Sequence, residues 1–306
     1  QPGEPILMLS SLKAMDGNNS SKQMDRAGHA NHHIFPSMYM ISRADIDVFK
    51  DDVHMCLGHR GNAEHHDAGG CADTWQAAST VDEDTVKVFE QTGIFLLACR
   101  HGMILTCAEM LRSGELYYPL ATINKLISVH GNDQAIGSDI RCSLTATLAA
   151  SLIGPKAKDA NVQLVVNAFH GHAHNCMCQL QYHPLYLPGT GLEDFKTCER
   201  VFSSSNATAM LICHASHFHY VQYLELHFNQ WDVDKYAELS TIISANTVDL
   251  DAYRMLHPNE NLDFESWVAE ELAYLRVVES EPKQDALRVT YVEELEQLAK
   301  LKCDFV

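Results

Sequence analysis

The chain has 306 residues, 46% of them hydrophobic, and its 40 acidic and 22 basic side chains give a formal net charge of −18. This length can bury one large core or two modest ones, whereas no apolar run reaches the roughly 18 residues that a membrane helix needs. The first residues show no basic segment followed by an apolar one, so we expect a soluble protein that is not secreted. The 10 Cys and 18 His are spread through the chain, which favours reduced thiols, some metal binding and an intracellular compartment over a disulfide scaffold.

The apolar pattern predicts a series of short elements in chain order. Residues 5–16 read as a first strand, and Ser42 is the expected N-cap of a helix over 43–55. The Gly, His and Asp content of residues 57–74 predicts a loop. The later elements are two buried strands within 93–105, helices over 118–130 and 143–153, a buried strand over 162–169, and a helix over 192–211.

The C-terminal part of the chain holds much of the negative charge. Apolar residues recur at helical spacing over 263–278 and again over 291–301, which predicts packing or partner helices. We therefore expect a core over 1–245, followed by an acidic helical region over 246–306.

Three acidic motifs suggest a two-metal site built from carboxylates. Asp16 follows the apolar run 6–9 and is expected at or just past a strand end, where sheets usually hold ligands. Asp139 lies well downstream, and Glu199 lies in the helix predicted over 192–211. Mg²⁺ prefers oxygen ligands and is held by a few carboxylates together with substrate phosphate. Taken without their surroundings, the same residues also fit a turn Asp, an exposed loop acid and a solvated helix Glu.

Many ordered motifs in the chain resemble the transposase domain of the Kyakuja-Dileera-Zisupton (KDZ) group of DNA transposons. The motifs are Asp16-Gly17-Asn18-Asn19-Ser20, Ser42-Arg43, Phe49-Lys50-Asp51, Cys71, Trp75-Gln76-Ala77-Ala78, Thr92-Gly93-Ile94-Phe95, Cys99-Arg100-His101-Gly102, Ser113-Gly114-Glu115-Leu116, Asp139-Ile140 with Cys142, Phe169-His170-Gly171-His172-Ala173-His174-Asn175, Cys178-Gln179, Gly191-Leu192-Glu193-Asp194, Cys198-Glu199-Arg200, Phe202-Ser203 and Asn206. Together they extend over roughly residues 5–300.

This resemblance implies an α/β fold, with an RNase H-like mixed-sheet core, a helical insertion over roughly 57–135 and a helical C-terminal region. It also implies DDE-type cleavage and strand transfer of DNA with Mg²⁺ or Mn²⁺, in which Asp16 contacts both metals, Asp139 the first and Glu199 the second. Nuclear localisation and self-association into a homo-oligomer would follow. Because the chain is so acidic, the grip on transposon ends is expected largely from regions outside it.

Two departures from the family pattern keep an alternative open. Lys196 stands where members often carry a Glu, and the nearest acidic substitute is Glu193. Beside Asp139, Ser138 replaces the usual aromatic residue, and Arg141 replaces a small one. The alternative is therefore a catalytically inactive, transposon-derived remnant that acts as a metal-stabilised interaction protein.

Cysteine and histidine residues form a second set of candidate ligands. His170, His172 and His174 alternate at period two, so on a strand they would share one face. A structural zinc site could be drawn from Cys71, Cys99, His101, His172, His174 and Cys178. The alternatives are histidines hydrogen-bonded to the backbone, or a zinc hydrolase built on the three alternating histidines.

Overall fold

The computed structural model describes residues 9–50, 52, 88–112 and 116–256, together with the isolated positions 269–271, 273, 274 and 291. It divides into two compact units, residues 1–260 and 261–306. The loop predicted over 57–74 and Cys71 lie outside the described residues, as do most of the predicted C-terminal helices. The predicted division at residue 245 stays a prediction, although one helix, His217–Leu256, runs continuously through that position.

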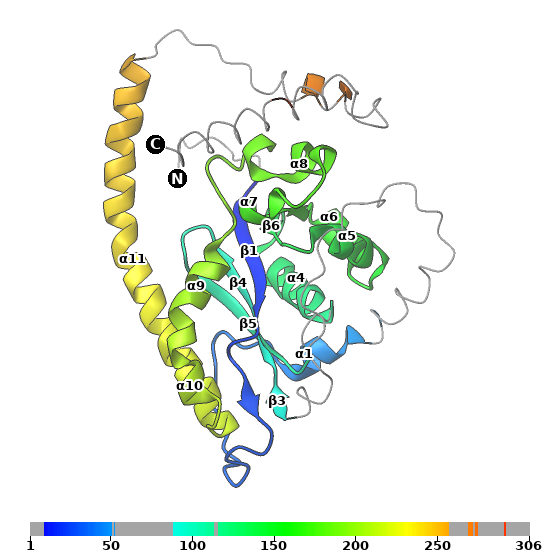
Figure 1. Cartoon of the computed structure of the whole chain (residues 1–306), viewed down its shortest axis with the longest axis vertical. Helices are drawn as coiled ribbons and strands as arrows, with labels where there is room; N and C mark the ends of the chain where they lie inside the picture. Colours follow the sequence, from blue (N-terminus) through cyan, green and yellow to red (C-terminus); the bar gives the residue numbers. More distant parts are fainter. Residues whose placement is uncertain are drawn as a thin grey trace. The chain divides into compact units, whose positions relative to one another are not determined.

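A five-stranded mixed sheet forms the centre of the first unit (Figure 1). Its strands are β1 (Ser11–Asn18), β4 (Gly93–Cys99), β5 (Ile104–Met110), β6 (Gln134–Gly137) and β7 (Gln163–Val165), in the order β5-β4-β1-β6-β7. The β4 strand is antiparallel to β1 and to β5, whereas β6 is parallel to both β1 and β7. A separate antiparallel pair joins β2 (Gln23–Met24) and β3 (Phe89–Gln91).

Alternation of side chains along β1 decides which residues face which layer. Met15 packs into the apolar cluster on one face of the sheet, and Leu12 and Ala14 pack into the cluster on the other face. Because successive side chains of a strand point to opposite faces, Asp16 shares the face of Leu12 and Ala14. The carboxylate of Asp16 is therefore directed to the layer that contains the helix with Glu199.

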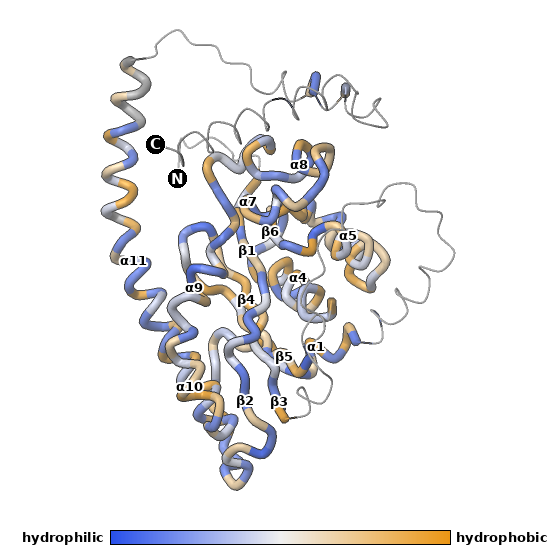
Figure 2. The backbone as a smooth tube through the Cα atoms, viewed as in Figure 1, coloured by the Kyte–Doolittle hydropathy of each residue, from blue (hydrophilic) through white to orange (hydrophobic). Residues whose placement is uncertain are grey.

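Helices cover both faces of the sheet (Figure 1). The first cluster packs the sheet against α1 (Arg43–Asp47), α4 (Tyr117–His130), α5 (Arg141–Ala150) and α6 (Gly154–Asp159). The second cluster packs it against α9 (Thr197–Ser205), α10 (Ala209–Ile212) and the first part of α11 (His217–Leu256). The described residues also include two short helices, α7 (Ala168–Gly171) and α8 (Cys176–Tyr182), and the 3-10 turns η2 (Pro184–Tyr186) and η3 (Asn206–Thr208). Figure 2 shows that β4 is largely apolar, whereas α11 mixes polar and apolar residues along its length.

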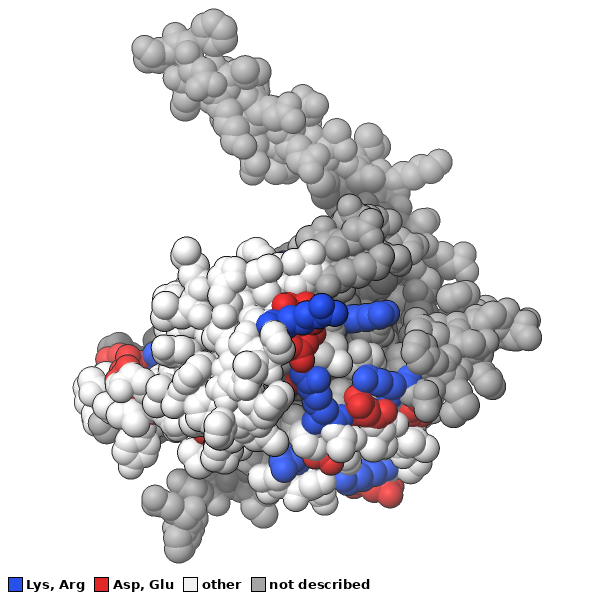
Figure 3. Space-filling model, turned by 90° about the horizontal axis from the view of Figure 1, so that it is seen from below, with Lys and Arg blue, Asp and Glu red and all other residues white. Residues whose placement is uncertain are grey.

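The described surface carries charges of both signs. On the face shown in Figure 3, Lys and Arg side chains lie next to Asp and Glu side chains instead of forming a continuous basic strip. None of the helices in the described parts of the chain has the length and apolar character that a membrane span requires.

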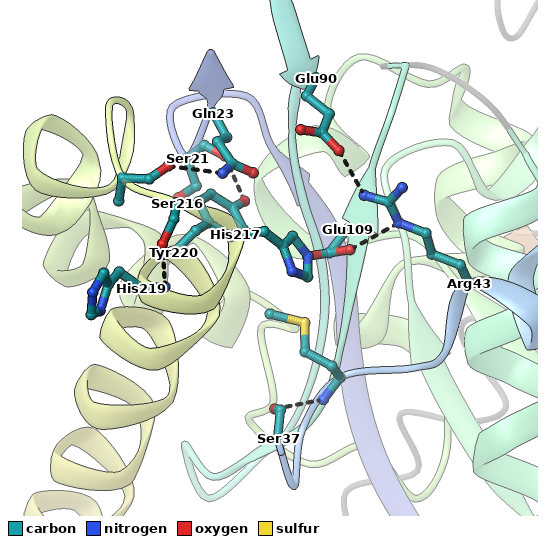
Figure 4. Close-up of polar contacts among 12 residues, drawn as sticks. Ser21, Gln23, Ser37, Arg43, Glu90, Glu109, Ser216, His217, His219 and Tyr220 are labelled. Carbon is teal, nitrogen blue, oxygen red and sulfur yellow. Dashed lines mark hydrogen bonds and ion pairs between the residues drawn. The ribbon is translucent and has the colours of Figure 1, made fainter. Parts of the chain in front are cut away.

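A buried ion pair fastens the start of α11 to the edge strand β5 (Figure 4). Glu109 is only 8% exposed, and its carboxylate lies 2.6 Å from Nε2 of His217 and 3.3 Å from Nε of Arg43. Burial by itself raises the pKa of Glu109, but the hydrogen bond from His217 and the charge of Arg43 lower it overall. The same hydrogen bond raises the pKa of His217, so each partner stabilises the charged form of the other.

Most of the predicted elements are present with shifted bounds. The helices predicted over 118–130 and 143–153 correspond to α4 and α5, and the two strands predicted within 93–105 correspond to β4 and β5. Ser42 caps α1 as expected, since its hydroxyl accepts a hydrogen bond from the Asp45 N–H, although the helix is shorter than 43–55. The helical insertion over 57–135 is not confirmed, because residues 93–110 belong to the central sheet.

The structure places the alternating histidines in and after a short helix and not on a strand. The buried strand predicted over 162–169 ends at Val165, and α7 and α8 follow. The physical reason is local capping: the side chain of Asn167 accepts from the His170 N–H, and that of Asn175 accepts from the Cys178 N–H. Two Asn caps therefore start helices where a period-two pattern suggested a strand.

The fold predicts that Gly137 does not tolerate a side chain. A Cβ at Gly137 would lie 2.3 Å from Cβ of Phe195, whereas a Cβ at Gly17 would meet its nearest neighbour, in Met110, at 3.4 Å. We expect Gly137→Ala to lower the free energy of unfolding by about 1–3 kcal/mol through overpacking. The matched control Gly17→Ala should change it by less than about 1 kcal/mol. Urea unfolding of both variants measures this, and equal stability of the two would contradict the packing described.

Candidate metal centre

Parallel pairing of β1 and β6 brings the first two acids to the same edge of the sheet. Ala14 is paired with Gly137, so Asp16 and Asp139 each lie two residues beyond that pair. The carboxyl ends of parallel strands meet at one edge, where ligand sites usually form. The sequence predicts Asp16 at or just past the end of its strand. In the structure β1 continues to Asn18, so Asp16 lies two residues before the end of the strand. Asp139 follows β6 after one intervening residue, Ser138, in the turn before α5.

The third acid reaches the same place from the first turn of α9. Cys198, Val201 and Phe202 bury one stripe of this helix against the sheet, as an amphipathic helix requires. The Cys198 thiol donates to the carbonyl oxygen of Ala14 at 3.2 Å, which fixes the start of α9 across β1. Glu199 is the next residue, and a carboxylate in the first turn is favoured by the helix dipole.

Asn167 and His170 connect the second and third acids. Asn167 is 2% exposed, and its amide nitrogen donates to Oδ1 of Asp139 and, at 3.2 Å, to Oε1 of Glu199. Nε2 of His170 lies 3.0 Å from Oδ2 of Asp139. Burial lowers the pKa of His170, and the charge of Lys196 lowers it further, so the ring is held in its neutral form near neutral pH. Asn167 and His170 thus orient the carboxylates of Asp139 and Glu199 without adding a positive charge.

The three acids perturb one another. Burial raises the pKa of Asp16 to about 7, and the charge of Glu199 adds to the rise, although the hydrogen bond from the Gly17 N–H at 2.7 Å opposes it. Burial raises the pKa of Asp139 to about 8, with further contributions from the charges of Asp16 and Glu199. Burial also raises the pKa of Glu199. Like charges held together in a partly buried place favour protonation unless a cation is present.

The donor atoms of this site fit a divalent cation. Asp139, His170 and Glu199 each offer a ligand atom, and these atoms all lie within 4.8 Å of one another. Oε2 of Glu199 is buried and, among the described residues, has no hydrogen-bond partner. A buried carboxylate oxygen of this kind needs a partner to offset the cost of its desolvation, and a metal ion would supply one. The predominance of carboxylate oxygens favours Mg²⁺ or Mn²⁺ over softer metals.

Lys196 lies at the rim of the site. Its Nζ is 3.8 Å from the ring centroid of Phe169, and its charge lowers the pKa of both Asp139 and Glu199. Glu193, the nearest acidic substitute by sequence, is occupied elsewhere, because its Oε1 accepts from the Phe195 N–H at 2.9 Å. The site therefore contains the carboxylate of Glu199 together with the positive side chain of Lys196, which stands where family members often have a second acid.

A second group of ligands lies beside the first. Cys142, His174 and Cys178 place their ligand atoms within 4.8 Å of one another. Of the candidates expected from sequence, only His174 and Cys178 belong to this group. Cys99, His101 and His172 belong to neither group within the described residues, and Cys71 lies outside them.

The zinc hydrolase alternative does not gain support. His170 contacts Asp139, His174 contacts the two cysteines, and the ring of His172 packs against His183 with centroids 5.7 Å apart. The three alternating histidines therefore do not converge on one ion.

Sequence reasoning missed three participants. No motif in the sequence singles out Asn167, although an Asn between a strand and a helix signals a cap whose amide can serve a second role. His170 stands out in the sequence only as one of three alternating histidines. Cys142 was noted in a motif, but nothing in its local pattern indicates that it meets residues more than thirty positions away.

The fold and site define a class of protein: a mixed α/β domain in which Asp139, His170 and Glu199 lie close enough together to hold a metal ion. The Kyakuja-Dileera-Zisupton transposase family matches residues 9–232, which is most of the chain, and the chain belongs to this family. Neither the curated proteins nor the solved structures contain a match to the chain.

The raised pKa of Asp16 predicts an unusual pH dependence of stability. An unfolded Asp ionises near pH 4, whereas Asp16 in the folded chain ionises only near pH 7. Between these values the folded state holds the extra proton, so the free energy of unfolding falls as pH rises. In the absence of divalent cations, Asp16→Asn should match the wild type at pH 4 and exceed it at pH 8 by about 1–4 kcal/mol.

Thermal or urea unfolding at the two pH values measures this difference. Addition of Mn²⁺ should stabilise the wild type more than Asp16→Asn, because only the wild type has the full set of carboxylates. A variant that is less stable than the wild type at pH 8, but not at pH 4, would contradict the burial of this carboxylate.

Proposed function

We propose that this chain is the catalytic domain of a DNA transposase that cuts and rejoins phosphodiester bonds with Mg²⁺ or Mn²⁺. The observation that carries the proposal is the meeting of Asp139 and Glu199 at the Asn167 amide, with Asp16 near enough for its charge to raise the pKa of Asp139. These acids come from a strand, a turn after the neighbouring parallel strand and a helix that are far apart in sequence, so their meeting is a property of the fold. Membership of the transposase family supports the same chemistry.

We propose further that the sheet is an RNase H-like core. The support is its topology: an antiparallel β5-β4-β1 unit continues into the parallel strands β6 and β7, and α9, which carries the third acid, follows later in the chain. Asp16 lies on β1, Asp139 lies in the turn after the neighbouring strand β6, and Glu199 lies in the first turn of α9. This is the order of sheet and acid-bearing helix that such a nuclease needs.

The chain's own residues hold, orient and charge the site. Asp16, Asp139 and Glu199 supply the oxygen ligands, and Asn167 fixes the relative orientation of the last two. His170, held neutral, can accept a proton or contribute a ligand atom beside Asp139. A bound divalent ion would activate the attacking oxygen and stabilise the leaving oxygen of the phosphodiester. Zinc suits this site less well, because it prefers sulfur and nitrogen ligands.

DNA is the proposed substrate, but the face shown in Figure 3 is poorly suited to grip it. A net charge of −18, with basic and acidic side chains interspersed on the face in Figure 3, works against tight phosphate binding. We propose that most of the affinity for transposon ends comes from regions outside this chain. Nuclear localisation and assembly into a homo-oligomer are part of the same proposal.

The second candidate is a remnant without catalysis, and one observation favours it. Lys196 brings a positive charge into the electrostatic neighbourhood of Asp139 and Glu199, where it competes with a metal ion. In this reading the fold and the family membership are retained, but divalent ions bind too weakly to support cleavage.

Substitution of the acids distinguishes the two candidates. Asp139→Asn and Glu199→Gln should each abolish Mn²⁺-dependent nicking of duplex DNA by the purified chain, because each removes a ligand charge while preserving shape. Asp133→Asn is a matched control: Asp133 lies at the opposite end of β6 and has a φ of 59°, which Asn tolerates. Gel analysis of supercoiled plasmid measures the nicking. Activity that survives both site variants, or no activity in any protein, would reject catalysis at this site.

Replacement of Lys196 tests its competition with metal. Lys196→Gln should tighten Mn²⁺ binding severalfold, up to about tenfold, because a like charge is removed from a half-exposed position near two ligands. Titration followed by electron paramagnetic resonance measures the free Mn²⁺. Lys125→Gln, on α4, controls for the change in net charge. Unchanged affinity would show that Lys196 does not hinder the metal.

A further inference from the structure

Three sulfur and nitrogen ligands meet next to the carboxylate site. The Sγ atoms of Cys142 and Cys178 lie 3.7 Å apart, and each lies 3.5 Å from Nδ1 of His174. Neither cysteine forms a disulfide within the described part of the chain. A disulfide requires its sulfurs about 2.05 Å apart, so this arrangement is not a bridged pair.

These separations match the edges of a zinc tetrahedron. With Zn–S bonds of about 2.3 Å and Zn–N bonds of about 2.0–2.1 Å, tetrahedral angles place two sulfurs about 3.8 Å apart and a sulfur and a nitrogen about 3.5–3.6 Å apart. All three observed distances agree with these values to about 0.1 Å. Such agreement in all three distances is more specific than the mere proximity of three ligand side chains.

We propose that Cys142, His174 and Cys178 bind one zinc ion, which is separate from the ions of the carboxylate site. The local structure holds these ligands in place. His174 and Cys178 are four residues apart, and the Asn175 side chain that caps α8 accepts from the Cys178 N–H at 2.8 Å. Nε2 of Gln179 donates to the carbonyl oxygen of His174 at 2.7 Å, so the turn before α8 is fixed on both sides.

The zinc ion joins the segments that carry the second acid and its hydrogen-bond partners. Cys142 lies in the first turn of α5, three residues after Asp139. His174 follows α7, whose N-cap is Asn167, the residue that donates to Asp139 and Glu199. A zinc ion at this position therefore fixes α5 relative to α7 and acts as a positioning centre for Asp139. This consequence, unlike zinc binding itself, rests on the proposed function.

Metal substitution in the full chain tests the site directly. After removal of bound metal, the wild type should bind one equivalent of Co²⁺ with an intense thiolate-to-cobalt charge-transfer band, which the carboxylate site cannot produce. Cys142→Ser and Cys178→Ser should each reduce zinc affinity by at least about tenfold, because each removes a direct ligand. Cys176→Ser, an exposed cysteine on the same helix as Cys178, should behave as the wild type.

Three results would overturn the zinc site: cobalt binding without a sulfur band, wild-type zinc affinity in Cys142→Ser, or a Cys142–Cys178 disulfide in the isolated protein. The wild-type cobalt titration decides the question even if a Cys variant does not fold. Nicking that depends on Asp139 and Glu199 is a separate readout, so failure of the zinc site and failure of the proposed function are distinguishable.

The positioning role has its own measurement. Metal-free wild type should bind Mn²⁺ about 10–100-fold more weakly than the same protein reloaded with one equivalent of zinc, the range typical for loss of support around metal ligands. Cys176→Ser should show the same gain on reloading. Zinc binding with no change in Mn²⁺ affinity would reject the positioning role and leave the zinc site intact.

Discussion

The structure depends on holding three carboxylates together in a partly buried place. Burial raises the pKa of Asp16, Asp139 and Glu199, and the charges of neighbouring acids add to the rise, so their assembly costs free energy unless opposite charge is supplied. The fold offsets part of this cost with the Asn167 amide, the start of α9 and the charge of Lys196. A divalent cation would offset far more, and the buried, unpartnered oxygen of Glu199 offers it a ligand. This geometry supports the proposed metal site.

The sheet makes this assembly rigid. Parallel pairing of β1 with β6 sets Asp16 level with Asp139, and the Cys198 thiol pins α9 over the backbone of Ala14. The second ligand group extends this support: Cys142 and His174 flank the segments that carry Asp139 and Asn167. A zinc ion there would stiffen the site from outside it, in the manner of groups that orient metal ligands without touching the metal.

Local patterns in the sequence predicted the helices and strands better than they predicted contacts between distant residues. The apolar run at 93–99 and the helical spacing at 117–130 identified β4 and α4, because burial dictates both patterns. Family resemblance, rather than spacing, selected the three acids that the fold gathers. The alternation of the three histidines suggested a strand, but the same spacing also occurs across two short capped helices. Cys142 and Asn167 were missed because their roles arise from long-range contacts that no local pattern records.

Anomalous diffraction from crystals soaked in Mn²⁺, with zinc-edge data from the same crystal form, tests the central claim most directly. The account predicts manganese between Asp16 and Asp139, with Glu199 in reach, and a separate zinc peak bounded by Cys142, His174 and Cys178. Absence of manganese at the three acids would contradict a metal-dependent catalytic site and favour the structural remnant.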